Sequence, residues 1–139
     1  MDKYLGLDLG TKTLGISMND SIGIAHPVET FRFPNNDYPK ALERVIALVE
    51  EHRINEIALG LPLHMSGEES KMSQAVRNFK ESLLSKKPNL KVTLIDERLT
   101  SISAHRTLAE LGMNTKKQKQ VVDMVAANEI LDTYIRMKK

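Results

Sequence analysis

Three acidic residues of this chain occupy positions where a carboxylate could do chemistry. Asp8 interrupts the apolar run Tyr4–Leu9, Glu97 comes just after a second apolar run, Val92–Ile95, and Asp123 shares a helical face with apolar residues. A carboxylate buried among apolar neighbours is costly unless a cation pairs with it. Three carboxylates without a histidine or cysteine cluster offer hard oxygen ligands, which suit Mg²⁺ or Mn²⁺ and argue against zinc.

Such a cluster is the usual protein part of a two-metal phosphodiester hydrolase, in which ions about 3.5–4 Å apart activate a water and stabilise the leaving oxygen. We therefore predict Asp8, Glu97 and Asp123 as catalytic and metal-binding residues. A run of lysines at the start of a helix is more often a solvated end, but these lie on the helix of Asp123 and could hold a phosphate backbone. The predicted substrate-binding residues are Lys12, Arg98, Lys116, Lys117 and Lys119.

Each acidic residue also has an ordinary structural explanation. Asp8 could belong to a turn at a strand end, and Glu97 could form an exposed ion pair with Arg98, which would be worth little. Asp123 could lie in the favourable field of a helix N-terminus, but a helix that starts near Thr115 places it in the third turn, beyond that effect. Together the three residues favour a shared site over three separate explanations.

The identity of the second acidic ligand stays open between two neighbours. Strand alternation places Asp96 and Glu97 on opposite faces, and the sequence does not say which side chain points toward Asp8. We favour Glu97.

The elements that must position these residues begin with a sheet. The stretch Tyr4–Ser17 predicts two strands joined by a turn at residues 10–12, and Ala25–Phe33 predicts a third, which makes an antiparallel meander. Asp37 can cap a helix over residues 38–52, with Pro39 in its first turn.

The second half of the chain alternates strands and helices. The apolar run Ile54–Leu61 predicts a buried strand, and Val92–Ile95 predicts another. The predicted helices carry Met72, Val76, Phe79 and Leu83, then Ala104, Leu108 and Leu111, and finally residues from a capping box at Thr115 onward. The expected fold is α/β, a mixed five-stranded sheet of a three-strand meander plus two parallel strands, with helices on both faces.

Length and composition limit the number of domains, the cellular location and the kinds of partner. At 139 residues we expect a single domain, 1–139. The absence of cysteine excludes disulfides and thiolate metal sites and permits a reducing compartment. No apolar run approaches the roughly 18 residues needed to span a bilayer, so we expect no membrane association and a cytoplasmic location. The net charge of +2 allows an anionic partner without requiring one.

Four stretches of the sequence resemble the signature blocks of the YqgF/RuvX family, in order and at a matching length. They are Tyr4–Ser17, Gly60–Gly67, Asp96–Ser101 and Lys119–Ala127. The resemblance implies an RNase H-like fold and a metal-dependent nuclease that matures the 5′ end of the small-subunit (16S) ribosomal RNA precursor. An older assignment of the family is Holliday junction resolution. The motifs place the metal-binding carboxylates at Asp8, Glu97 and Asp123, with two ions expected once substrate is bound.

The resemblance also implies that residues 60–67 form a mobile loop over the site, in which we expect His64 to be a surface histidine. Structured RNA is the favoured substrate, and a four-way DNA junction is the alternative. Cutting both strands of a junction symmetrically would call for a two-fold dimer, so the choice between monomer and homodimer bears on the substrate. No residue distinguishes RNA from DNA, because that discrimination usually rests on contacts to the 2′-hydroxyl.

Two other classes of function compete with a nuclease. The stretch Asp8–Thr13 looks like the first phosphate loop of the actin and sugar-kinase ATPases, but those proteins hold the nucleotide between two domains, and this chain has length for one. A catalytically silent scaffold that binds ribosomal RNA would predict that Asp8→Asn leaves the biological role intact.

Overall fold

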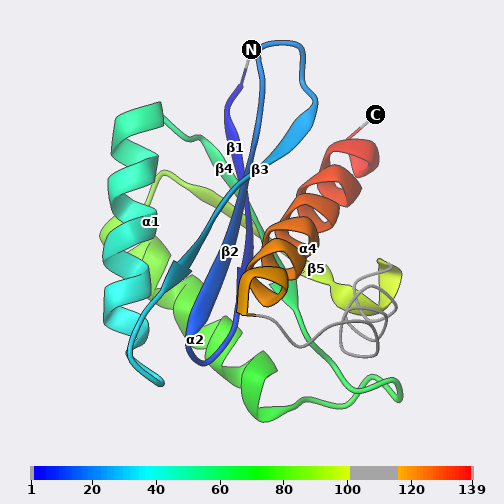
Figure 1. Cartoon of the computed structure of the whole chain (residues 1–139). Helices are drawn as coiled ribbons and strands as arrows, with labels where there is room; N and C mark the ends of the chain where they lie inside the picture. Colours follow the sequence, from blue (N-terminus) through cyan, green and yellow to red (C-terminus); the bar gives the residue numbers. More distant parts are fainter. Residues whose placement is uncertain (1, 101–115, 139) are drawn as a thin grey trace.

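The computed structural model describes residues 2–100 and 116–138, with side chains described from residue 122 onward in the second range. Five strands form one sheet in the order β3-β2-β1-β4-β5 (Figure 1). The strands are β1 (Tyr4–Leu9), β2 (Thr13–Asn19), β3 (Ala25–Arg32), β4 (Glu56–Leu61) and β5 (Lys91–Asp96). The pairs β1–β2 and β2–β3 are antiparallel, and β1–β4 and β4–β5 are parallel. The expected meander with two added parallel strands is confirmed.

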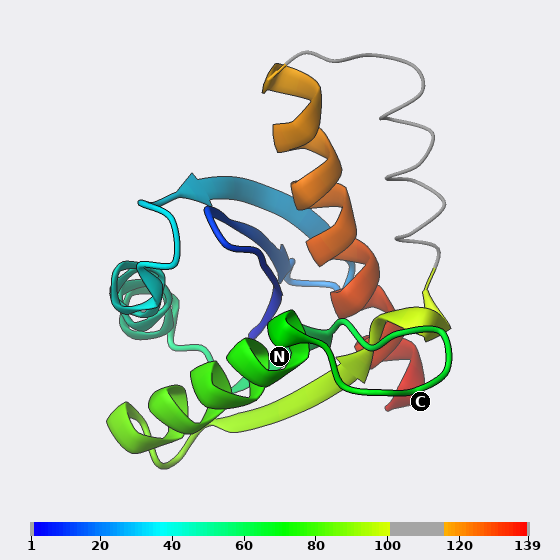
Figure 2. The ribbon, with the colours of Figure 1, turned by 90° about the horizontal axis from the view of Figure 1, so that it is seen from below.

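Helices cover both faces of this sheet, as expected. The helices α1 (Tyr38–His52) and α2 (Lys71–Lys86) lie on one face, and α4 (Lys116–Met137) crosses the other, which Figure 2 shows along the edge of the sheet. A short 3₁₀ helix, η1 (Glu97–Leu99), follows β5. The helix predicted to carry Ala104, Leu108 and Leu111, and the capping box at Thr115, lie outside the described residues. No helix that the structure describes is both long and apolar enough to cross a membrane.

The helix boundaries follow from capping residues. The side chain of Asp37 accepts a hydrogen bond from the backbone N–H of Lys40, which satisfies one of the unpaired donors at the start of α1. Ser70 and Ser73 exchange reciprocal side-chain to backbone hydrogen bonds at the start of α2. Arg53 ends α1 in the left-handed conformation, with φ of 54°.

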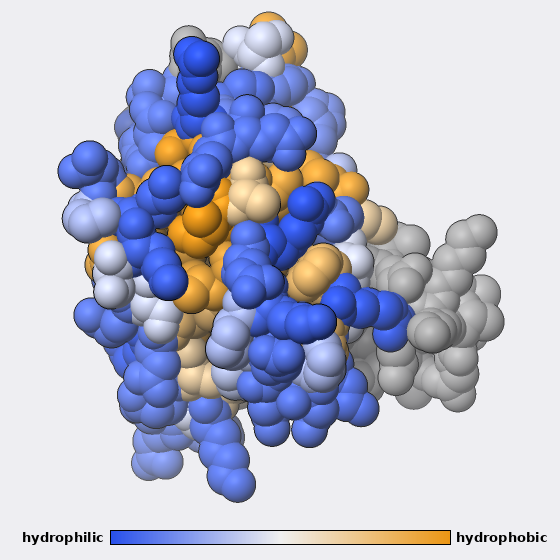
Figure 3. Space-filling model, turned by 90° about the vertical axis from the view of Figure 1, so that its left-hand side faces the viewer, coloured by the Kyte–Doolittle hydropathy of each residue, from blue (hydrophilic) through white to orange (hydrophobic). Residues whose placement is uncertain are grey.

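Strand alternation divides the core into two unequal parts. Leu5, Leu7 and Leu9 point toward α1 and α2 and join the larger cluster of buried apolar residues. The smaller cluster lies under α4. Figure 3 shows an apolar strip between polar side chains on one face of the molecule. Leu42 of α1 and Phe79 of α2 line a cleft between these two helices.

A polar cluster fastens the carboxyl end of α4 to the sheet. Lys138 Nζ lies 2.8 and 3.0 Å from the two carboxylate oxygens of Glu56 in β4, and the hydroxyl of Tyr134 donates to the same carboxylate. The ammonium also lies 5.0 and 5.2 Å from the ring centroids of Tyr4 and Tyr134, within range of a cation–π attraction. Burial works to raise the pKa of Glu56, but the hydrogen bonds from Lys138 and Tyr134 outweigh it, and the pKa is lowered.

Replacing Lys138 by methionine should lower the free energy of unfolding by about 1 kcal/mol near pH 7, because the apolar stem remains while the charge is lost. A carboxylate with a lowered pKa contributes stability that is present above its ordinary pKa of 4.5 and is lost as the pH falls through the folded value. The difference between wild type and variant should therefore shrink below pH 4.5. Urea denaturation at pH 7 and at about pH 3 measures it, and an equal difference at both would contradict the assignment.

Candidate active site

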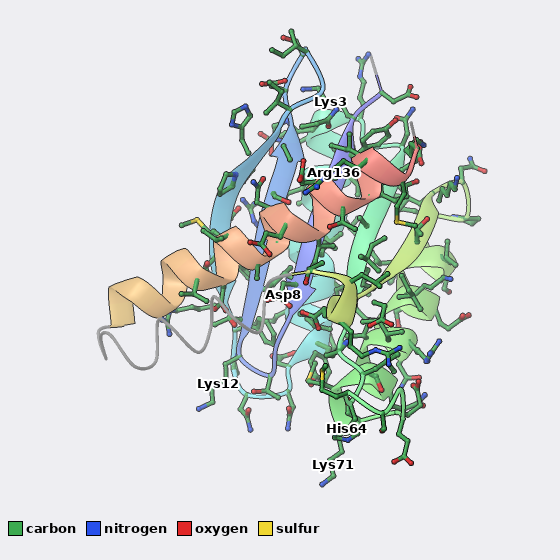
Figure 4. All side chains as sticks on the ribbon, turned by 90° about the vertical axis from the view of Figure 1, so that its right-hand side faces the viewer. Lys3, Asp8, Lys12, His64, Lys71 and Arg136 are labelled. Atoms are coloured by element: carbon green, nitrogen blue, oxygen red, sulfur yellow. The ribbon has the colours of Figure 1, made fainter. Side chains whose placement is uncertain are left out.

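Asp8 lies near the carboxyl end of the central strand, β1, on the sheet face that α4 crosses (Figure 4). Only 6% of the residue is exposed. Its neighbours Leu7 and Leu9 point to the opposite face and pack in the larger core, so the alternation of the strand directs Asp8 toward α4. A carboxylate in this position has lost most of its contact with bulk water and needs polar or cationic compensation.

On one side of Asp8, α4 rests directly on the sheet. Gly15 of β2 is the register partner of Asp8, and a Cβ atom added at Gly15 would lie 2.1 Å from the backbone oxygen of Asp123. The same close packing recurs at Gly6, where an added Cβ would lie 2.6 Å from the backbone oxygen of Ala127. Since no side chain fits between strand and helix, the backbone of Asp123 is held one strand away from Asp8.

On the other side of Asp8, Glu97 reaches the same face. It opens η1 directly after β5 and is 8% exposed. A Cβ atom added at Gly60 of β4 would lie 3.4 Å from Cγ and Cδ of Glu97, so the acidic side chain lies against this glycine. The parallel register of β1 and β4 puts Asp8 and Gly60 at the same level of two adjacent strands. Because Glu97 lies against Gly60, it lies over the strand next to Asp8 and at the same level as Asp8.

The neighbouring acid, Asp96, is engaged elsewhere. Its carboxylate receives hydrogen bonds from Arg98, with Nε 3.1 Å from Oδ1 and Nη2 2.7 Å from Oδ2. These side-chain hydrogen bonds hold the pKa of Asp96 below its ordinary value. Ile95 packs under α4, so alternation turns Asp96 to the opposite face. Of the two acids, Glu97 is the one that shares the face of Asp8.

The acidic residues thus lie over three adjacent strands in the order Asp123, Asp8, Glu97. Among the residues that the structure describes, no three acidic or histidine side chains form a group that could hold a metal ion. The backbone therefore brings Asp123 beside the other two, but convergence of the three carboxylates on one ion stays a prediction.

The residues predicted to bind substrate have different surroundings. Lys12 is exposed in the β1–β2 turn and lies at the same end of the molecule as His64 and Lys71 in Figure 4. The guanidinium of Arg98, another residue predicted to bind substrate, is paired with Asp96. The side chains of Lys116, Lys117 and Lys119 lie outside the described residues.

The loop expected to cover the site is held by its own hydrogen bonds. The N–H of His64 donates to the carbonyl of Glu68 at 3.0 Å, and the N–H of Gly67 donates to the carbonyl of His64 at 2.8 Å. Ser70 Oγ donates to the carbonyl of Pro62 at 2.7 Å and closes the base of the loop. His64 itself is exposed, as expected for a surface histidine. The expected mobility of the loop stays a prediction.

Sequence reasoning missed the three strand glycines, Gly6, Gly15 and Gly60, that let α4 and Glu97 approach the sheet. Their signal was available, since a glycine inside a strand often marks a place where another backbone or a ligand comes close. A strand glycine does not reveal which segment of the chain will approach it.

Known proteins are similar to this chain over nearly its whole length. A family model described as RuvX, Holliday junction resolvase, matches residues 2–137. A protein of Oceanobacillus iheyensis is 38% identical over 140 residues, which cover 98% of this chain and 99% of the relative. A protein of Lactococcus lactis subsp. cremoris is 37% identical and covers 96% and 93%, and one of Staphylococcus aureus is 32% identical and covers 96% and 94%. All three carry the name "Putative pre-16S rRNA nuclease".

Solved structures show the same fold. Thermus thermophilus RuvC, in complex with a Holliday junction substrate, superposes with a TM-score of 0.62 at 13% identity, covering 100% of this chain and 98% of that one. A second structure of RuvC from T. thermophilus gives 0.57, also at 13% identity, and covers 98% and 96%. At this identity the likeness establishes the fold alone, which is RNase H-like.

Proposed function

The chain belongs to the RuvX family, and we propose that it is a metal-dependent nuclease that matures the 5′ end of pre-16S ribosomal RNA. Its relatives across nearly the whole chain are named as nucleases, and their names point to this RNA. The structural observation that carries the proposal is a pair of buried carboxylates on one sheet face, Asp8 near the end of β1 and Glu97 just after β5. We propose that this activity takes place in the cytoplasm, as the names of the relatives suggest.

The donor set fits a hard divalent cation. Asp8 and Glu97 offer carboxylate oxygens in a site largely withdrawn from water, which suits Mg²⁺ or Mn²⁺. We propose that these two residues and Asp123 hold the metal, and that two ions are held once substrate phosphate adds its oxygens. A bound ion of this kind supplies an activated water and stabilises the leaving oxygen.

The chain's own residues would orient and enclose the reacting phosphate. The strands fix Asp8 and the turn that carries Glu97, and α4 excludes water from one side, which strengthens the electrostatic interactions inside. Lys12 and the lysines at positions 116, 117 and 119 would contact flanking phosphates, whose binding should depend on salt. We propose that residues 1–139 act as one nuclease domain.

A second candidate is resolution of four-way DNA junctions. The description of the family model favours it. Symmetric cleavage of two strands would require a two-fold dimer, because each site serves one strand. A protein that stays monomeric on its substrate would therefore count against this candidate, and the oligomeric state of this chain is part of the test.

A cleavage assay tests both proposals. Purified protein is incubated with a 16S precursor that carries its 5′ extension, or with a four-way DNA junction, in Mg²⁺, in Mn²⁺ or in EDTA. We expect shortening of the RNA at its 5′ end in either metal, no cleavage in EDTA, and at least tenfold slower cleavage of the junction. Symmetric junction cleavage by a dimer with intact RNA would favour the second candidate. Tight RNA binding without cleavage under any condition would favour the silent scaffold.

A further inference from the structure

We propose that Arg98 is a positioning residue, which fastens the loop of residues 62–70 to the turn that carries Glu97 and does not bind substrate phosphate. The inference rests on the proposed function only where it assigns Glu97 to the active site. The contacts that carry it belong to Arg98, Asp96 and the loop.

Asp96 and Arg98 lock the turn around Glu97 from both sides. The carboxylate of Asp96 accepts a hydrogen bond from the backbone N–H of Arg98 at 2.9 Å and receives the guanidinium of the same residue through Nε and Nη2. A planar guanidinium held by two parallel hydrogen bonds has a defined orientation. Glu97 is the single residue between these partners, so the pair sets where its backbone leaves β5.

The remaining arm of the guanidinium reaches the loop. Arg98 Nη1 donates to the carbonyl of Met65 at 3.3 Å, across 33 positions of sequence. At Gly67 the backbone has φ of +91°, and an added Cβ would lie 3.3 Å from Nη1. A left-handed glycine is what allows the loop to close over the guanidinium. The loop follows the end of β4, two residues after Gly60, the glycine against which Glu97 packs. The loop and the turn of Glu97 therefore border the same site.

Most of the donors of Arg98 are already occupied, which makes the residue poorly suited to a phosphate. Three of its five N–H groups are engaged, because those on Nε and Nη2 face Asp96 and one on Nη1 faces Met65. The carboxylate also cancels the charge at a salt-bridge distance of 2.7 Å. A lysine has one ammonium in place of the planar fork and cannot make both contacts in this geometry.

Amide hydrogen exchange without metal tests the fastening itself. We expect Arg98→Ala to raise exchange severalfold at the amides of His64, Gly67 and Thr100, whose acceptors lie within the loop or the turn. Arg98→Lys should give an intermediate increase. Arg44→Ala is the matched control, because Arg44 forms a similar pair with Glu29 and has the same side-chain exposure of 33%. Exchange at the three amides that is unchanged in Arg98→Ala, or raised equally by Arg44→Ala, would overturn the proposal.

Kinetics and binding separate positioning from phosphate contact. We expect Arg98→Ala to lower kcat for RNA cleavage by about 10–100-fold and to raise the Mg²⁺ concentration for half-maximal rate, as for residues that orient metal ligands. The Kd for RNA, measured without cleavage in Ca²⁺, and its salt dependence should match those of wild type and Arg44→Ala. A phosphate contact would instead weaken binding and reduce the salt slope by about one, which would overturn the proposal. If wild type cleaves nothing, the proposed function fails, and hydrogen exchange still decides the role of Arg98.

Discussion

Asp8→Asn should lower kcat for RNA cleavage by roughly 10³-fold or more, which corresponds to about 4 kcal/mol of transition-state stabilisation. The substitution keeps the shape of the side chain but replaces an anionic oxygen by an amide group, which binds a divalent cation weakly. Because Asp8 is only 6% exposed, removing its charge also removes a desolvation cost. Thermal unfolding of the variant without metal checks that it is folded, so that loss of activity is not attributed to unfolding.

Metal binding gives this prediction a readout that does not depend on cleavage. Wild type should gain thermal stability in Mn²⁺ through binding to the native state, and Asp8→Asn should lose that gain. Asp2→Asn is the matched control, because it removes the same charge from an exposed position just before β1. Full cleavage by Asp8→Asn would remove Asp8 from the site. Its full biological activity in cells would support a silent scaffold.

Gly15→Ala should lower the free energy of unfolding by about 2–3 kcal/mol, although the substitution adds a single methyl group. The new Cβ would lie 2.1 Å from the backbone oxygen of Asp123, so strand and helix must separate. Part of α4 is held by other contacts, including a 2.8 Å hydrogen bond from Ser17 Oγ to the carbonyl of Ala127, which limits how easily the helix can shift. Urea denaturation measures the loss.

The same variant should cleave RNA about 10²-fold more slowly even where it is fully folded, because a misplacement of about 1 Å at a catalytic group can cost that much. Gly10→Ala is the control, since among the described residues beyond its chain neighbours its added Cβ would meet only Thr13, at 3.3 and 3.4 Å. We expect it to cost less than about 1 kcal/mol. A Gly15→Ala protein with wild-type stability and rate would show that the position of α4 against β2 does not matter to the site.

Local patterns were sufficient for most of the elements. The helix predicted over residues 38–52 is α1 (Tyr38–His52), and the strand predicted at Ala25–Phe33 is β3 (Ala25–Arg32). Helical spacing of apolar residues and a capping aspartate act within a few residues, so they can be recognised without the rest of the chain. The mixed sheet followed from the order of these elements, because short turns favour antiparallel neighbours and helical crossovers favour parallel ones.

The sequence by itself determined that Asp8 and Glu97 stand at strand ends and that Asp123 lies on the buried face of its helix, because strand and helix periods are local. Only the tertiary structure decided that Glu97, and not Asp96, lies on the sheet face of Asp8, and that Arg98 pairs with Asp96 and with a loop 33 residues away. It also decided that α4 rests on bare glycine backbone, through contacts between residues as far as 110 positions apart. Such choices depend on which surfaces meet after the chain folds, and no short-range pattern contains that information.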